Sequence, residues 1–299
     1  QRNKMLIGEI AGLATALFWS FSSLFFTFGV KKVGVIQLNI DRLFFAAVYL
    51  FATIIIFGII PHITFYQIEY LVLSSITGLV LGDTFLFKAF SEIGPRISLL
   101  VMSFAPPVAA ILAYIFLGES LGSWAIIGIL TTTLGVSIVV LERDKESNKI
   151  TIKNKMGFLW AFLGMLGQAS GLIFAKIALN NAEIHPFVAS FTRIFSAWIM
   201  LIPIGLLTKR YKFGYKAYSE HKKSILAPTI GAILGPFLGI TLSLVAITYA
   251  KVGIASTLMS TTPILMLPIS YFAYKEKLHW TAYVGSIIAV LGIAILFLR

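Results

Sequence analysis

The residues best suited to chemistry in this sequence are charged side chains placed inside apolar runs. Asp83 and Lys88 both lie within the apolar run 70–92. A charge at bilayer depth is costly unless it faces a polar cavity or a partner. We therefore predict that Asp83 binds a substrate ammonium group or a coupling proton, and that Lys88 faces a substrate carboxylate. The alternative is a structural ion pair, with a Lys88 side chain that snorkels toward the membrane surface.

Helix geometry requires that the partner of Asp83 come from elsewhere in the chain. Lys88 follows Asp83 by five residues, which is about 140° around an α-helix, so the two side chains do not share a face. Arg42 and Arg193 lie near the starts of two other apolar runs and are the expected partners. The alternative for both arginines is that they snorkel to the membrane interface.

Weakly polar and soft side chains are concentrated in several apolar runs, where they could line a cavity. Such residues also mediate ordinary helix packing in membranes, so packing is the alternative for each of them. The predicted cavity residues, in addition to Asp83, Lys88 and Arg193, are Trp19, Ser23, Ser98, Met102, Ser103, Gln168, Ser170, Ser256, Met259 and Ser260. Pro106 and Pro263 remove backbone donors inside helices and are predicted hinge or kink positions.

Catalytic and metal-binding constellations are missing from the sequence. The chain contains no cysteine, which excludes disulfides, thiolate nucleophiles and Cys-based metal sites. Its four histidines fall in loops or at the ends of apolar runs, and no zinc-protease, P-loop or nucleophile-elbow motif occurs. We therefore expect no enzymatic activity, no metal site and no cofactor.

The elements that must position these residues are membrane-spanning helices. Hydrophobic residues make up 58% of the 299 residues and charged residues 12%, about half the charged fraction of an ordinary soluble domain. A span needs roughly 20 apolar residues. The first run is expected to be a retained helix rather than a cleaved signal peptide. The sequence predicts an all-α membrane protein with ten transmembrane helices at 5–29, 38–60, 70–92, 95–117, 121–141, 156–179, 186–207, 224–249, 253–274 and 279–298.

These spans form an internal repeat. We predict two five-helix repeats, at 1–141 and 156–299, joined by a basic linker at 142–155. An odd number of spans inverts the second repeat relative to the first, an architecture typical of secondary transporters. Positions that coincide at an offset of 157 include Gly82 with Gly239, Met102 with Met259, Pro106 with Pro263 and Glu119 with Glu276, and an offset of 151 aligns Arg42 with Arg193.

Three stretches carry a resemblance to a known family. They are FWS at 18–20, PVAAILAYIFLGESLGSWAIIGILTTTLGVSIV at 107–139 and PILMLPISYFAYKEKLHWTAYVGSIIAVLGIAI at 263–295. They resemble the EamA family of the drug/metabolite transporter superfamily, and the match covers nearly the whole chain as two copies. The resemblance implies a central cavity between two five-helix halves, and movement of small metabolites, often outward, by alternating access.

The sequence and the resemblance together predict a function and its partners. We expect a secondary transporter that moves a small polar or zwitterionic, amino-acid-like metabolite across the cytoplasmic membrane, in the outward direction. The alternatives are a proton-coupled exporter of lipophilic cations or drugs, and a membrane protein that does not transport. The expected partners are the small-molecule substrate and the lipid bilayer, and no nucleic acid. Glycines seven residues apart in 121–141 and 279–298 could pack within one chain or form a homodimer seam.

The orientation in the membrane is predicted in two ways that disagree. The net charge is +12. The termini and even-numbered loops carry 4 Lys or Arg residues, whereas the odd-numbered loops carry 16. Short loops rich in Lys and Arg stay cytoplasmic, so this count places both termini outside. The resemblance implies the opposite, because relatives are often drawn with both termini inside.

Overall fold

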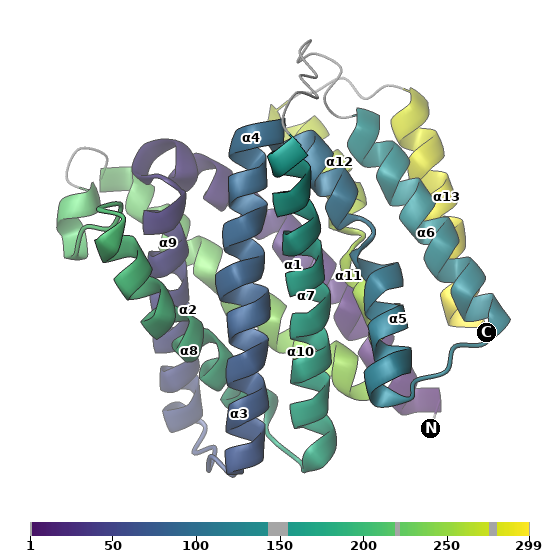
Figure 1. Ribbon diagram of the computed structural model, residues 1–299, viewed down its shortest axis with the longest axis horizontal. Helices are drawn as coiled ribbons and strands as arrows, with labels where there is room; N and C mark the ends of the chain where they lie inside the picture. The colour runs from purple at the N-terminus through teal and green to yellow at the C-terminus, as the bar shows by residue number, and fades with distance from the viewer. Residues whose placement is uncertain (1, 143–154, 219–221, 275–279, 299) are drawn as a thin grey trace.

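The computed structural model describes residues 2–142, 155–218, 222–274 and 280–298, which form helices joined by short connections (Figure 1). Within these residues, ten helical segments are long and apolar enough to cross a membrane. The two ends of the chain lie on the same side of the bundle (Figure 1). The predicted all-α architecture with ten membrane-spanning helices is therefore confirmed. The predicted linker 142–155 lies outside the described residues except for its two ends.

Each half contains five spans, some of which are divided into shorter helices. The first half comprises α1 (Arg2–Val33), α2 (Val35–Ile56), α3 (Phe65–Ser74), the π-helical stretch η1 (Ser75–Gly82), α4 (Asp83–Met102), α5 (Ala105–Leu117) and α6 (Ser123–Glu142). The second comprises α7 (Lys155–Asn181), α8 (Pro186–Leu207), the 3₁₀ turns η2 (Gly214–Tyr218) and η3 (Lys222–Ile225), α9 (Leu226–Ala232), the π-helical stretch η4 (Ile233–Ile240), α10 (Thr241–Tyr249), α11 (Val252–Met259), α12 (Thr262–Tyr274) and α13 (Trp280–Leu298).

The two halves repeat the same irregularities as well as the same helices. α2 and α8 begin 151 residues apart and end 151 residues apart. Each half interrupts its third span with a π-helical stretch of eight residues, η1 or η4. Each half then breaks between two helices at positions 157 residues apart, after Met102 and after Met259. Apolar composition alone does not dictate these breaks, so their coincidence supports the predicted repeat.

The boundary between the third and fourth spans differs from the prediction. We expected a break between 92 and 95, but α4 continues to Met102 and the chain turns at Ser103 and Phe104. A Gly-Pro pair does not have to end a helix in a membrane, where neighbouring helices can satisfy the freed backbone groups. In the second half the predicted boundary between 249 and 253 agrees with the gap between α10 and α11, but the predicted span 253–274 is divided into α11 and α12.

The two predicted hinge prolines lie in the first turns of the helices that follow the breaks. Pro106 is the second residue of α5, and Pro263 is the second residue of α12. Proline is favoured in the first turn of a helix because its missing N–H would have no partner there anyway. These prolines therefore start the helices that follow the two breaks rather than kinking a continuous helix, and a hinge at either position stays a prediction.

The first helix of each half packs against the opposite half. α1 contacts α9, η4, α10, α11 and α12, whereas α7 contacts α3, η1, α4 and α5. Glycines allow the backbones to approach closely. A Cβ atom added at Gly171 of α7 would lie 2.9 Å from Cα of Gly78 in η1, and one added at Gly8 of α1 would lie 2.7 Å from the backbone nitrogen of Ala250. The halves are therefore interleaved rather than set side by side.

α6 and α13 form a separate pair at one edge of the bundle (Figure 1). Their glycines face each other: a Cβ atom added at Gly135 would lie 2.4 Å from the backbone nitrogen of Ala289 and 2.5 Å from the carbonyl oxygen of Gly285. The small-residue faces predicted as either an internal contact or a dimer seam are thus covered within one chain. A homodimer through these helices would have to use their exposed outer faces, which carry Leu134 and Ile287.

Candidate functional site

Asp83 begins α4 directly after the π-helical stretch η1 and forms an ion pair with Arg42 of α2. The distance from Arg42 Nη2 to Asp83 Oδ2 is 2.9 Å, and the two side chains are 18% and 14% exposed. Arg42 lies about 10 Å along the axis from the start of α2, because each helical residue rises 1.5 Å. The prediction that an arginine from another span pairs with Asp83 is confirmed for Arg42.

Gln168 of α7 occupies the other carboxylate oxygen of Asp83. Its Nε2 donates hydrogen bonds to Asp83 Oδ1 at 2.7 Å and to the carbonyl oxygen of Gly78 at 3.0 Å. The approach depends on Gly82, where an added Cβ atom would lie 3.3 Å from the Gln168 backbone nitrogen. The predicted candidates Asp83 and Gln168 are therefore in direct contact, and both contact a span interrupted by a π-helical stretch. Such stretches are frequent at functional sites.

Two further groups orient the Arg42 side chain. Its Nε donates to Asn39 Oδ1 at 2.7 Å, one turn earlier on the same helix. Its guanidinium carbon lies 5.1 Å from the centre of the Phe26 ring of α1, a distance that suits a cation–π contact. Arg42 is thus held by an amide oxygen, a ring face and a carboxylate, which fixes the direction of its planar donor fork.

Arg193 is the repeat counterpart of Arg42, but its environment is different. It lies on α8, is 3% exposed, and interacts electrostatically with Asp83. Its Nη2 is close to η1, since a Cβ atom added at Gly78 would lie 3.0 Å from it. Its Nε is buried and has no hydrogen-bond partner among the described residues. Arg193 is therefore drawn toward Asp83 without the close pairing that Arg42 makes.

We call Arg42, Asp83, Gln168 and Arg193 the ionic cluster. Its members come from α2, α4, α7 and α8, so it lies where the two halves meet. The cluster holds two guanidinium groups and one carboxylate, which leaves one net positive charge in a protein interior. A buried arrangement of this kind can hold a charged or strongly polar ligand group by charge-assisted hydrogen bonds.

Trp19 of α1 is placed against η4 in the way that Gln168 of α7 is placed against η1. A Cβ atom added at Gly239 of η4 would lie 2.4 Å from Trp19 Nε1. Gly82 is the repeat counterpart of Gly239, and a Cβ atom added there would lie close to Gln168. Trp19 and Gln168, both predicted cavity residues, therefore each face the glycine of a π-helical stretch. Only the Gln168 side of this pseudo-symmetric pair is joined to an acidic residue by a described hydrogen bond.

Lys88 lies outside the ionic cluster. Its side chain is exposed, and its Nζ lies 3.7 Å from the centre of the Trp160 ring of α7. Asp83 and Lys88 are on different faces of α4, as the helix geometry predicts. That Lys88 faces a substrate carboxylate stays a prediction. In the described structure its ammonium group lies against Trp160.

The remaining candidates make local or core contacts in the described conformation. Ser23 donates to the carbonyl oxygen of Ser20 at 2.7 Å and lies 3.0 Å from the sulfur of Met266, while Ser103 shares a 2.9 Å hydrogen bond with Ser137. Ser170 and Ser260 bond carbonyl oxygens of their own helices. Of the other candidates, Ser98, Ser256 and Met259 are buried and Met102 is partly buried.

A second polar network fixes the long loop after α8 to the start of α2. Tyr218 donates to Asp41 Oδ2 at 2.5 Å, Gln37 donates to the same oxygen at 2.8 Å, and the Lys212 backbone nitrogen donates to Gln37 Oε1 at 2.7 Å. Burial, together with the charge of Asp41 and its hydrogen bond, raises the pKa of Tyr211 to about 12. The same causes raise the pKa of Tyr218.

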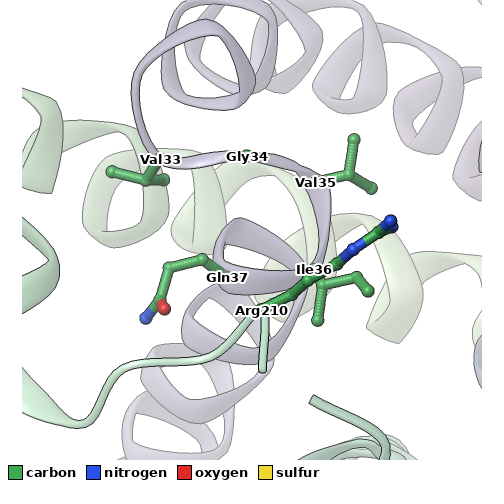
Figure 2. Close-up of a pocket in the computed structure, with 6 residues that line it drawn as sticks. All are labelled: Val33, Gly34, Val35, Ile36, Gln37 and Arg210. Carbon is green, nitrogen blue, oxygen red and sulfur yellow. The ribbon is translucent and has the colours of Figure 1, made fainter. Parts of the chain in front are cut away.

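A cavity of about 370 Å³ lies next to this network, at the turn between α1 and α2 (Figure 2). It is lined by Val33, Gly34, Val35, Ile36, Gln37 and Arg210. The arginine comes from the loop after α8, and the other five residues come from the α1–α2 turn (Figure 2). None of the cluster residues lines it, so this cavity is not the central cavity that the resemblance implies.

A third polar network joins the halves on the side of the bundle where the chain ends lie (Figure 1). Glu119 accepts a hydrogen bond from the Val252 backbone nitrogen at 2.7 Å and lies 3.9 Å from Lys176 Nζ. Lys176 also donates to carbonyl oxygens at the end of α10, including that of Thr248 at 3.2 Å, and Lys251 donates to the carbonyl oxygen of Ser120. These contacts give Glu119 a structural role at the junction of the two halves. Its repeat counterpart Glu276 lies outside the described residues.

Sequence reasoning missed several residues of these networks. Arg42 was expected only as a partner of Asp83, although its coincidence with Arg193 at the repeat offset indicated a shared location. Asp41 carried a usable signal, because it is an acidic residue inside an apolar run. Tyr218 and Gln37 carried none, since their contacts depend on how a long loop folds back onto α2.

The ten spans, the inverted halves and the interior ionic cluster define an integral multi-pass membrane protein with the architecture of a secondary transporter. The chain belongs to the EamA-like transporter family, whose family model matches residues 6–141 and again residues 155–298. This family is part of the drug/metabolite transporter superfamily, so the resemblance noted in the sequence is confirmed.

Similar proteins carry names that state transport without a substrate. An uncharacterized transporter of Clostridium kluyveri is 24% identical over 143 residues, which are 48% of this chain and 45% of that protein. The uncharacterized transporter YetK of Bacillus subtilis is 24% identical over 152 residues, 50% of this chain and 43% of that protein. The chain thus spans less than half the length of these curated relatives in the matched region.

A solved crystal structure, named only as that of a protein, shares the fold. It superposes with a TM-score of 0.77 at 16% sequence identity and covers 97% of this chain and 96% of its own chain. At this identity the likeness concerns the arrangement of helices and says nothing about a ligand.

Proposed function

We propose that this protein is a secondary transporter that moves a small polar or zwitterionic metabolite outward across the cytoplasmic membrane by alternating access. Membership of a transporter family supports the general class. Since the sequence contains no nucleotide-binding P-loop, we propose that an ion gradient or the substrate gradient drives the movement.

The observation that carries this proposal is the ionic cluster. Arg42, Asp83 and Gln168 come from three spans and from both halves, and they make a connected set of hydrogen bonds at 2.7 and 2.9 Å. Charged groups within membrane spans are costly and are retained mainly where they serve a substrate or ion pathway. A site at the contact between two repeats is where such transporters bind their substrates.

The interrupted helices also support alternating access. η1 and η4, and the breaks after Met102 and Met259, occur at equivalent positions of the two halves. Interrupted spans free backbone carbonyl groups and allow one part of a helix to move relative to the next. In this proposal the parts before and after these interruptions rearrange around the ionic cluster.

The competing idea of a lipophilic-cation exporter has less support. It would need Asp83 to be available to a cation, but its two carboxylate oxygens accept from Arg42 and Gln168. A cation that entered would also meet Arg193. We therefore place the charged group of the substrate nearer the arginines than the aspartate.

The test begins with ligand binding by the purified full chain in detergent. Amino acids, nucleosides, sugars, organic acids and lipophilic cations are compared for their effect on the melting temperature, because a ligand that binds the folded state stabilises it by mass action. We expect a polar or zwitterionic compound to raise the melting temperature of the wild type and not that of Asp83→Asn. Lys4→Met, which changes an exposed charge near the start of α1 and outside every predicted site, is the matched control and should respond as the wild type does.

The stabilising compound is then assayed for uptake into liposomes that contain the protein. Saturable uptake that Asp83→Asn lowers and Lys4→Met retains would support the proposal. Binding with no movement of any compound in either direction, under an imposed proton or substrate gradient, would contradict transport. A response confined to lipophilic cations would replace the proposed substrate class by the cation alternative.

A further inference from the structure

The hydrogen bonds of the ionic cluster are distributed unequally between its two arginines. Arg42 has an amide oxygen, a ring face and a carboxylate as partners. Arg193 is more deeply buried, yet its Nε has no hydrogen-bond partner among the described residues. Leaving a buried charged donor unsatisfied costs more than leaving a neutral one, so a native structure normally supplies an acceptor. The described residues do not supply one to this atom.

Two hydroxyl groups on the two segments that meet at Arg193, α8 and η1, also have no hydrogen-bond partner in the described part of the chain. Ser190 lies three residues before Arg193 on α8, and Ser75 lies three residues before Gly78 on η1, the residue that faces Arg193 Nη2. The side-chain oxygens of both serines are buried without a hydrogen-bond partner in the described part of the chain. α8 and η1 pack against each other. Three unsatisfied buried polar groups therefore lie on two segments in contact, which indicates a place for a polar ligand.

The charge at this place selects the kind of ligand. Arg42 and Asp83 balance each other, and the guanidinium of Arg193 is left in excess. A bound group with one negative charge would neutralise the cluster, whereas a cation would add to the excess. Arginine binds planar oxyanions through two parallel hydrogen bonds, and serine hydroxyls can donate further ones. A carboxylate satisfies both requirements with its single charge.

We propose that Arg193 is the anchor for a carboxylate group of the transported substrate, with the hydroxyls of Ser75 and Ser190 as additional donors. This inference rests on the proposed function and narrows it to substrates that carry a carboxylate. Asp83 and Gln168 then have a positioning role, since they hold Arg42 and the η1 backbone beside the anchor. A phosphate ester, with a larger charge, is the alternative that the test separates.

The first experiment needs no knowledge of the natural substrate. The melting temperature of the purified full chain is titrated with sodium acetate against sodium chloride at constant ionic strength, and acetamide serves as the neutral isostere. We expect acetate to raise the melting temperature of the wild type, acetamide to have no effect, and Arg193→Gln to lose the acetate response. Arg193→Lys keeps the charge but loses the planar fork, so its apparent acetate affinity should fall at least tenfold.

Two variants keep the test sharp if Arg193→Gln is poorly folded. Gly78→Ala places a methyl group 3.0 Å from Arg193 Nη2 and should weaken the acetate response, whereas Gly122→Ala meets nothing within 4 Å and should leave it unchanged. An acetate response equal in wild type and Arg193→Lys, or an equal response to acetate and acetamide, would overturn the carboxylate anchor. A stronger response to inorganic phosphate than to acetate would overturn it in favour of a phosphate ester.

Uptake into liposomes separates failure of this inference from failure of the proposed function. If a neutral or cationic compound is transported while acetate has no effect on the wild type, transport stands and the carboxylate anchor is wrong. If acetate acts through Arg193 but no carboxylate, carboxamide or other compound is transported, the anchor stands and the transporter proposal is wrong. If a carboxylate is transported and its carboxamide is not, and if Arg193→Lys reduces that transport at least tenfold, both the carboxylate anchor and the transporter proposal are supported.

Discussion

Arg42 and Arg193 occupy the same position in two copies of one helix, the eighth residue of α2 and of α8, but only Arg42 forms a close ion pair with Asp83. Asp83 follows Gly82, whereas Ile240 follows the repeat counterpart Gly239, so the two copies cannot both be paired in the same way. The repeat supplies two equivalent arginines, and a single carboxylate makes them different.

The Arg42–Asp83 pair should be strongly coupled in its effect on stability. Arg42→Gln leaves a largely buried carboxylate without its closest counter-charge and should cost about 3–5 kcal/mol of unfolding free energy. The double variant Arg42→Gln with Asp83→Asn should cost less than the sum of the two single changes. Unfolding of the four proteins in a double-mutant cycle measures the coupling, and additive costs would show that the pair contributes no interaction energy of its own.

Gln168 should matter for stability through the two hydrogen bonds that it donates. Gln168→Leu removes the donors to Asp83 and to the Gly78 carbonyl oxygen and should lower the unfolding free energy by about 1–3 kcal/mol. Ser170→Ala is the matched control on the same helix, because the Ser170 hydroxyl bonds only carbonyl oxygens of α7 itself. Thermal melting in detergent compares the two, and an equal loss for both variants would contradict the role given to Gln168.

The contact between α6 and α13 should tolerate no side chain at Gly135. A methyl group there would lie 2.4 Å from the backbone nitrogen of Ala289, and backbone atoms cannot move aside as a flexible side chain can. Gly135→Ala should therefore force the helices apart and cost about 1–3 kcal/mol. The control Gly122→Ala introduces a methyl group into open space. Equal melting temperatures for the two variants would show that α6 and α13 are not packed as described.

The loop after α8 should lose its attachment at high pH. The pKa of Tyr211 is about 12 in the folded protein, compared with its ordinary value of 10.0. Between these values the unfolded chain has lost the phenol proton while the folded chain still binds it, so the stability contributed by the neutral phenol falls as pH rises from 10 to about 12. The melting temperature should fall more steeply with pH across this range for the wild type than for Tyr211→Phe. An equal dependence of the melting temperature on pH in the two proteins would show that ionisation of Tyr211 does not affect stability.

The sequence was sufficient for the large-scale plan of the protein and for part of its site. Hydropathy located ten spans, and the coincidence of Arg42 with Arg193 indicated which charges could meet Asp83. The sites of helix interruption could not be predicted from the sequence. The residues of η1 show the same apolar pattern whether the stretch forms a π-helix or an α-helix. The place of Lys88 depended on Trp160, a residue on another helix, and no pattern local to α4 contains that information.

The interleaving of the halves sets the order in which the protein can be completed during synthesis. α1 is made before the other described helices, but α9 begins only at Leu226, and the neighbours that α1 contacts end with α12. At about 5–20 residues per second, roughly 10–40 s pass before the first of them has been made. During that time Glu9, Thr15 and Ser20, which are buried in the finished protein, lie in a helix without its final neighbours. α1 therefore precedes most of its packing partners in synthesis and can complete its contacts only after α12 has been made.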